Sequence, residues 1–291
     1  MSQLDLVDAV LYADVFDCAA AEDDVWRYSR TPLARADLGE RLAELDGLVH
    51  RRDGFVCLAG REELLAEAPA RRRRATRLHR RACRVARVLQ HAPFVRGLLL
   101  TGSAAAGEAG PGADPDLLVL VAPGRLGTAF ALLGPLARVT GGRVLCPNHY
   151  RSVAHLTLDR RDMYVARELV QAWPLSGAAA RFLEANAWTR ELLPNAAPRG
   201  GGVRPLPLGR AAQRVAEALL PALVEPRLRR VAHRRLRVHH EGTPPPDVLA
   251  ALDAGVELRF HASQVHEQAL DGYAARRAAL LGRYGPSSAA S

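Results

Sequence analysis

The chain has 291 residues, 48% of them hydrophobic and 24% charged. This composition excludes an intrinsically disordered protein and is sufficient for one large domain or two to three small ones. The 40 basic and 31 acidic residues give a formal net charge of +9, which favours polyanionic partners such as nucleotides or nucleic acid without choosing among them. Because the sequence contains no lysine, a phosphate can be bound only by arginine, backbone N–H groups or a metal ion.

The four cysteines are far apart and form no Cys-x-x-Cys pair: Cys18, Cys57, Cys83 and Cys146. Such spacing is typical of reduced thiols in the cytoplasm. Asp5 and Asp8 interrupt the first apolar stretch, so no signal peptide is expected, and no run of about 18 apolar residues occurs. We therefore expect a cytoplasmic protein with no membrane partner.

Residues 1–60 are predicted to form three short helices followed by a hairpin. The expected elements are helices ending near Phe16, over Glu22–Tyr28 and from Thr31-Pro32, then strands Gly47–His50 and Phe55–Leu58 around an Asp53-Gly54 turn. This order resembles a winged-helix module. Such a module could contact DNA through Arg51 and Arg52 at the hairpin tip, or could serve only for packing or dimerisation.

Residues 61–92 are predicted to form one long, arginine-rich connecting helix. Its apolar stripe is expected at Ala75, Leu78, Ala82, Val85 and Leu89. Arginines occupy the remaining positions, beginning with Arg71–Arg74. They indicate either a solvated basic face or a surface that contacts the phosphates of an acceptor or a nucleic acid.

A polar segment between two predicted buried strands contains the main candidate site. Val95–Leu100 is followed by the turn Gly102-Ser103, and Asp114 and Asp116 begin the second apolar run ten residues later. Side chains two positions apart on a strand share a face, so the two carboxylates should converge. Adjacent carboxylates favour a bound cation, and their hard oxygens suit Mg²⁺. The backbone N–H groups and hydroxyl of the turn could bind phosphate.

This pattern resembles the nucleotidyltransferase superfamily, which includes polymerase-beta-like, aminoglycoside-type and minimal nucleotidyltransferases. The matching positions are Gly102, Ser103, Gly107, Asp114 and Asp116. The departures are Ala106 where arginine is common, Ala113 where serine is common, and Pro115 between the acids. The resemblance implies that Asp114 and Asp116 bind Mg²⁺, for which a one-metal and a two-metal site both stay open, and that Gly102 and Ser103 bind the nucleotide.

The predicted fold class is α+β. A small mixed-sheet nucleotidyltransferase core over 93–175 is completed by a helix over Leu126–Val139 and a strand near Arg143–Tyr150. The winged-helix-like module flanks it on the N-terminal side. A helical C-terminal region over 176–285, with a Pro/Gly-rich linker over 194–209, follows it.

The third carboxylate expected for two-metal transfer is missing from its usual strand in the superfamily, which is here Val144–Tyr150. By resemblance to aminoglycoside-type members, Glu168 on the helix predicted over Asp162–Trp173 is the preferred base. Asn148 as an oxygen ligand and His149 as a base are alternatives. Without any such group, the protein would bind nucleotide but not turn it over.

The sequence thus predicts a Mg²⁺-dependent enzyme that transfers a nucleoside monophosphate from a nucleoside triphosphate to an acceptor hydroxyl, releasing pyrophosphate. The acceptor could be a small molecule, a protein or a nucleic acid. The main alternative is a winged-helix DNA-binding regulator with a non-catalytic nucleotide-binding domain. A transferase that modifies a partner protein is a third interpretation.

Overall fold

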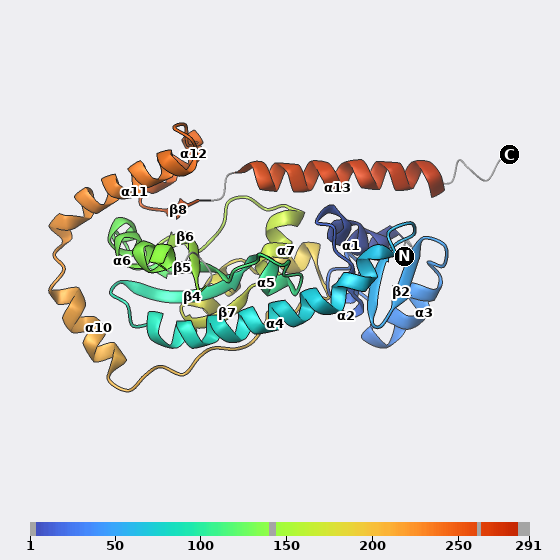
Figure 1. Ribbon diagram of the computed structural model, residues 1–291, viewed down its shortest axis with the longest axis horizontal. Helices are drawn as coiled ribbons and strands as arrows, with labels where there is room; N and C mark the ends of the chain where they lie inside the picture. The colour runs from blue at the N-terminus through green and yellow to red at the C-terminus, as the bar shows by residue number, and fades with distance from the viewer. Residues whose placement is uncertain (1–3, 140–143, 261–262, 285–291) are drawn as a thin grey trace.

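The computed structural model describes residues 4–139, 144–260 and 263–284, and it has an α+β architecture with two sheets (Figure 1). A three-stranded sheet has the order β1-β3-β2, and a five-stranded sheet has the order β7-β4-β5-β6-β8. The long helix α4 (Glu63–Leu89) runs from the N-terminal elements along the larger sheet. None of the described helices is long and apolar enough to cross a membrane.

The N-terminal elements alternate helices with short strands. They are α1 (Leu4–Val15), β1 (Ala20–Ala21), α2 (Glu22–Arg27), the 3-10 turn η1 (Arg35–Asp37), α3 (Leu38–Ala43), β2 (Val49–Arg52) and β3 (Phe55–Leu58). Strand β3 pairs antiparallel with both β1 and β2. At the tip of the hairpin, Asp53 and Gly54 have φ of 53° and 77°, the left-handed conformations that a two-residue hairpin turn requires. The predicted hairpin is therefore confirmed.

The third predicted helix starts later than the sequence indicates. Residues 31–34 are not helical, and α3 begins only at Leu38. The side chain of Asn195 explains the difference, because its Oδ1 accepts from Leu33 N at 3.0 Å and its Nδ2 donates to Thr31 O at 2.8 Å. Trp26 Nε1 also donates to Leu33 O. These tertiary hydrogen bonds hold the Thr31-Pro32 segment extended, against its local helix-start signal.

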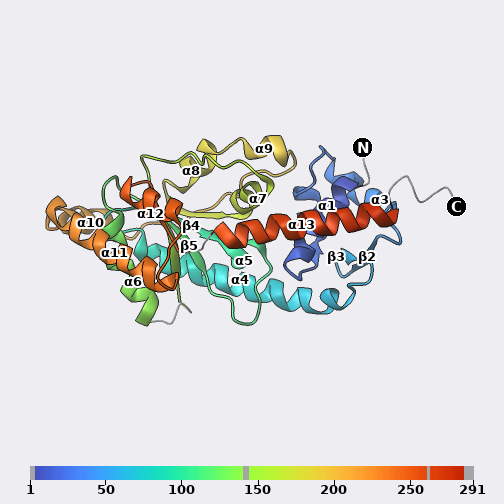
Figure 2. The same cartoon turned by 90° about the horizontal axis from the view of Figure 1, so that it is seen from above.

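Helix α4 confirms the predicted long helix and covers the sheet with one apolar face. Its buried positions facing the core are Ala75, Leu78, Ala82, Ala86 and Leu89. They pack against a hydrophobic cluster that includes Leu98 and Leu100 of the sheet. The helix contacts strands β4 and β7, and Figure 2 shows it running beneath the sheet elements toward the N-terminal helices.

The central elements form a mixed sheet. They are β4 (Val95–Thr101), α5 (Gly102–Ala106), β5 (Asp116–Val121), α6 (Leu126–Val139), β6 (Cys146–Ser152), α7 (Met163–Gln171) and β7 (Trp173–Gly177). Strands β4 and β5 are antiparallel, whereas β5 and β6 are parallel and are joined by α6. Helix α6 has the predicted bounds. The third strand lies over Cys146–Ser152, and Arg143, where it was expected to begin, is outside the described residues.

The C-terminal elements are α8 (Ala179–Ala185), α9 (Thr189–Leu192), α10 (Gly209–Ala218), η2 (Ala222–Val224), α11 (Glu225–His239), α12 (Pro246–Asp253), β8 (Glu257–Arg259) and α13 (Ser263–Tyr284). This part of the chain is not only helical, because β8 pairs antiparallel with β6 and completes the larger sheet. Helix α13 returns to pack on α1 (Figure 1). Two helices that are far apart in the sequence, α1 and α13, therefore lie side by side.

Candidate active site

Three strands of the larger sheet bring their polar ends together at one edge. In the β4–β5 pair, Thr101 lies opposite Asp116, and in the β5–β6 pair Asp116 lies opposite Cys146. Gly102 follows Thr101 directly and begins α5. This register places the Gly102-Ser103 turn, the first acid of β5 and the first residue of β6 next to one another.

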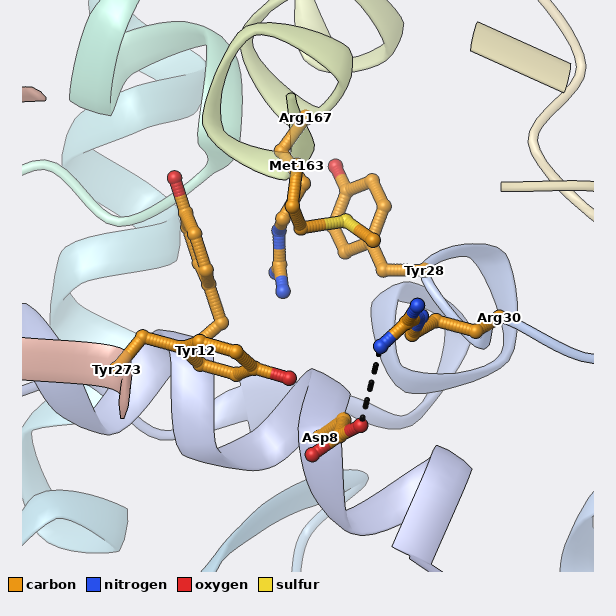
Figure 3. A pocket seen from close by; sticks show the side chains of 7 residues that line it. All are labelled: Asp8, Tyr12, Tyr28, Arg30, Met163, Arg167 and Tyr273. Atoms are coloured by element: carbon orange, nitrogen blue, oxygen red, sulfur yellow. Dashed lines mark ion pairs between the residues drawn. The ribbon is translucent and has the colours of Figure 1, made fainter. Parts of the chain in front are cut away.

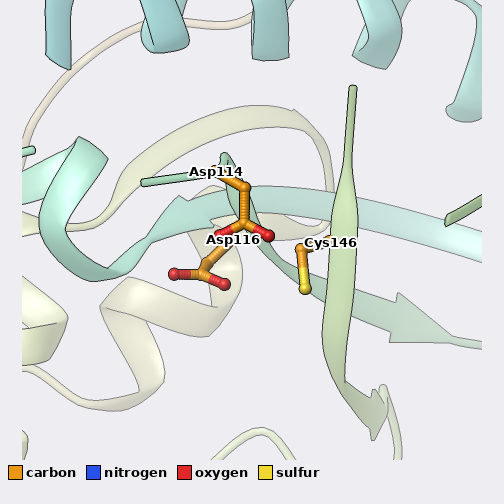
Figure 4. Close-up of side chains that lie close together, drawn as sticks. All are labelled: Asp114, Asp116 and Cys146. Atoms are coloured by element: carbon orange, nitrogen blue, oxygen red, sulfur yellow. The ribbon is translucent and has the colours of Figure 1, made fainter. Parts of the chain in front are cut away.

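Asp114, Asp116 and Cys146 form a compact group that could hold a metal ion. One ligand atom from each lies within 4.8 Å of the others, and all three residues are half-buried (Figure 4). The two carboxylates converge as the sequence predicts, although Asp114 precedes the strand and is separated from it by Pro115. Cys146 was missed as a site residue. Only the parallel pairing of β5 with β6 brings its thiol to the acids.

The electrostatics of this group favour a bound cation. Burial, followed by the charges of Asp114 and Glu168, raises the pKa of Asp116 to about 7. Burial, followed by the two aspartates, raises the pKa of the Cys146 thiol to about 12. A negative charge on one of these groups therefore disfavours ionisation of its neighbours. A divalent cation would remove that repulsion. The carboxylate oxygens suit Mg²⁺, whereas the sulfur suits a softer ion such as Zn²⁺.

The Gly102-Ser103 turn is built directly against Asp116. Gly102 has φ of 65°, and a Cβ at this position would lie 2.5 Å from Asp116 Oδ2. Both the left-handed backbone and the lack of space require glycine. Ser103 is exposed at the start of α5, where its hydroxyl is accessible to a ligand.

Glu168 is brought to this turn by α7. The Gly102 N–H and Gln171 Nε2, the latter at 2.5 Å, donate hydrogen bonds to its carboxylate. Burial raises the pKa of Glu168 to about 7, an effect opposed first by Arg167 and then by these two hydrogen bonds. Glu168 is close enough to raise the pKa of Asp116, so the structure groups all three predicted acids around one turn.

The two alternative residues on β6 have different surroundings. Asn148 Nδ2 donates to Asp116 Oδ1 at 2.6 Å, so it lies beside the acid pair and orients one of its carboxylates. His149 instead contacts Glu257 Oε2 of β8 at 3.1 Å. Asn148 is therefore a neighbour of the site, and His149 is held by the edge strand.

Arg167 connects the helix of Glu168 to the N-terminal elements. Its guanidinium lies 3.9 Å from the ring centre of Tyr12 and 4.3 Å from that of Tyr28 (Figure 3). The side chain is buried, and its Nη1 donates to Ala9 O of α1. A guanidinium between two aromatic rings gains cation–π attraction on both faces. The N-terminal elements thereby fix the position of α7 and of the carboxylate it carries.

Arginines of α4 bind the loop between α5 and β5. Arg71 Nη1 donates to Glu108 O at 3.4 Å, and Arg74 Nε donates to Ala109 O at 2.9 Å. The Arg72 guanidinium lies against Gly107, which has φ of 90°. Part of the arginine run therefore supports the loop that leads from the turn to the acid pair.

Comparisons of the chain with protein-family models, curated proteins and solved structures found no match. The chemical interpretation of the site consequently depends on its geometry. That geometry comprises a carboxylate pair, a neighbouring thiol, an exposed serine turn and a third carboxylate with a raised pKa.

Proposed function

We propose that the protein is a Mg²⁺-dependent nucleotidyltransferase. The observation that carries this proposal is the convergence of Asp114, Asp116 and Glu168 on the Gly102-Ser103 turn. The order and pairing of β4, α5, β5, α6 and β6, a small mixed sheet with the turn after its first strand, support it. This arrangement offers a cation site beside a phosphate-binding turn, which is what phosphoryl-centre substitution requires.

In this proposal Asp114 and Asp116 hold the metal, whose chemistry when bound is to neutralise charge on the α-phosphate. The Ser103 hydroxyl and backbone N–H donate to the terminal phosphates. The Gly102 N–H is already engaged by Glu168, so Ser103 carries more of the phosphate binding than a free Gly-Ser turn would require. Together these groups orient the triphosphate for in-line attack.

Glu168 is proposed as the proton acceptor. The acceptor hydroxyl oxygen forms a bond to the α-phosphorus, the bond to the bridging oxygen of pyrophosphate breaks, and the hydroxyl proton passes to the Glu168 carboxylate. A carboxylate with a pKa near 7 is a stronger base than an ordinary one and is still partly ionised at neutral pH. Its hydrogen bonds from Gly102 and Gln171 hold it in a fixed orientation.

Transfer of label from nucleoside triphosphates carrying ³²P at the α-position tests the proposal. The wild-type protein is incubated with each of the four triphosphates, Mg²⁺ and pooled small-molecule, protein and RNA acceptors. We expect labelled product and pyrophosphate with the wild type and neither with D114N. The exposed Asp159→Asn serves as the matched control and should retain full activity. Equal labelling by D114N and wild type would refute the proposal.

A DNA-binding regulator is the second candidate, favoured by the N-terminal order α1-β1-α2-α3-β2-β3 with β3 central in its sheet. The charges on these N-terminal elements are less favourable for DNA binding. Arg51 of the hairpin pairs with Glu22 at 2.7 Å, and α3 and its ends carry Glu40, Glu44 and Asp37. Duplex DNA binding with a steep salt dependence that is lost in R51Q/R52Q, without nucleotidyl transfer, would favour this candidate.

A further inference from the structure

A cavity lies at the opposite end of β4 from the acid pair. It has a volume of about 430 Å³ and lies between strands β4 and β7 and helix α10. Gly97 of β4 pairs with Gly177 of β7 beside it, whereas Thr101 pairs with Asp116 at the candidate active site. Four residues of strand separate the two places by roughly 13 Å. The cavity is therefore distinct from the acid pair.

The charges around this cavity are predominantly positive. Glu217 of α10 is neutralised, because Arg96 Nη1 and Nη2 contact its two carboxylate oxygens at 2.7 and 3.0 Å. Arg210 and Arg214 are exposed on the same helix, and neither forms an ion pair with another residue in the described part of the chain. Two guanidinium groups thus remain available to a ligand.

Two buried polar atoms of the lining also lack partners. Ser176 is 8% exposed, and its Oγ makes no hydrogen bond. His91 Nε2 accepts from Leu206 N at 3.0 Å, so a neutral imidazole carries its proton on Nδ1, which is buried and has no acceptor. Unsatisfied buried donors are costly, and each calls for an oxygen that accepts from it.

We propose that this cavity binds a small phosphate monoester. The doubly charged phosphate would be held by Arg210 and Arg214, with oxygens that accept from Ser176 Oγ and His91 Nδ1. Planar guanidinium groups suit phosphate geometry, and the volume lies within the range of small-molecule sites. The proposal is independent of nucleotidyl transfer, since no residue of the acid pair lines this cavity.

Isothermal titration calorimetry of the full-length protein in EDTA tests it. Inorganic phosphate is the first probe and ribose 5-phosphate the second, so that binding of the phosphate group alone is separated from recognition of its organic part. We expect one saturable site for ribose 5-phosphate. R210Q/R214Q should weaken binding by about tenfold or more, and S176A by a smaller factor.

The controls separate this site from the acid pair and from general charge effects. R227Q/R230Q removes two exposed arginines of α11 and should leave binding unchanged, as should D114N. Circular dichroism checks that each variant is folded. Absence of binding to the wild type, equal weakening by both arginine pairs, or loss of binding in D114N alone would overturn the proposal. Failure of nucleotidyl transfer would leave these outcomes unaffected.

Discussion

Gly102 and Asp116 are in such close contact that a methyl group on Gly102 would lie 2.5 Å from Asp116 Oδ2. The residue that opens the turn and the acid that begins β5 are therefore fixed relative to each other by contact. Because Gly102 N–H also donates to Glu168, the same glycine connects two carboxylates from different elements. It is the structural centre of the proposed site.

Gly102→Ala should destabilise the protein and damage the metal site. The left-handed φ of 65° costs a non-glycine residue about 1–2 kcal/mol, and the clash moves Asp116. We expect a lower melting temperature and weaker Mg²⁺ binding. Gly112→Ala is the control, since a Cβ there meets nothing within 4 Å. If both variants unfold at the same temperature, the close contact is not a constraint.

Ser103→Ala should weaken triphosphate binding more than monophosphate binding. The serine hydroxyl is proposed to donate to the terminal phosphates, and a hydrogen bond to a charged group contributes roughly 1.5–3 kcal/mol. Equilibrium dialysis with the two nucleotides in Mg²⁺ measures the difference. Equal losses for both would place the phosphates elsewhere.

Glu168→Gln should lower the rate of transfer by about 10²–10⁴-fold while leaving nucleotide affinity nearly unchanged. The reason is that a base acts on the acceptor, whereas Asp114 and Asp116 act on the nucleotide through the metal. The pH profile gives an independent readout, because the rate should rise through pH 7 in the wild type, near the pKa of Glu168. A variant that lost affinity and rate together would indicate a structural role.

The metal-free protein should become more stable as the pH falls from about 8 to about 5. Asp116 and Glu168 have folded-state pKa values of about 7, above the ordinary carboxyl range. Between these values the folded state binds protons that the unfolded state does not, so acidification raises the free energy of unfolding. Thermal unfolding in EDTA measures this slope.

Asp116→Asn provides the comparison for that slope, because it removes one of the carboxyl groups whose pKa is raised to about 7, while Glu168 and the buried Glu108 remain. The dependence on pH should become shallower in the variant, and Mg²⁺ should stabilise the wild type most at high pH. Identical slopes for wild type and variant would mean that Asp116 ionises normally.

Cys146→Ser should change metal preference. A thiolate favours Zn²⁺ or Cd²⁺, whereas carboxylates suit Mg²⁺, and the Cys146 sulfur lies with the two aspartates. The variant should bind Cd²⁺ more weakly and Mg²⁺ about as well as the wild type. Charge-transfer absorption of a Cd²⁺–thiolate bond is the direct signal. Unchanged absorption in the variant would exclude Cys146 as a ligand.

The parts of the site that follow one another in sequence could be predicted from the residues, whereas Cys146 could not be, and Glu168 was expected only through the family resemblance. The strand, the Gly102-Ser103 turn and the acid pair form a local pattern that the fold preserves. Cys146 joins them only through the β5–β6 register. The position of Glu168 depends on the docking of α7, which Arg167 and the N-terminal tyrosines determine.

The same distinction applies to the fold. The hairpin turn at Asp53-Gly54 and helix α6 follow local signals. Strands β7 and β8 are short and lack a clear alternation, so only their pairing with β4 and β6 identifies them. The expected helix start at Thr31-Pro32 is overridden by Asn195, whose contact with Leu33 spans 162 positions of the chain.

A crystal structure with Mn²⁺ and a non-hydrolysable nucleoside triphosphate tests the central claim most directly. The account predicts an anomalous Mn²⁺ peak coordinated by Asp114 and Asp116, with the terminal phosphates on Ser103 and the α-phosphate facing Glu168. Crystals of D114N should show no such peak. A triphosphate bound elsewhere, or Mn²⁺ bound equally well in D114N, would contradict the account.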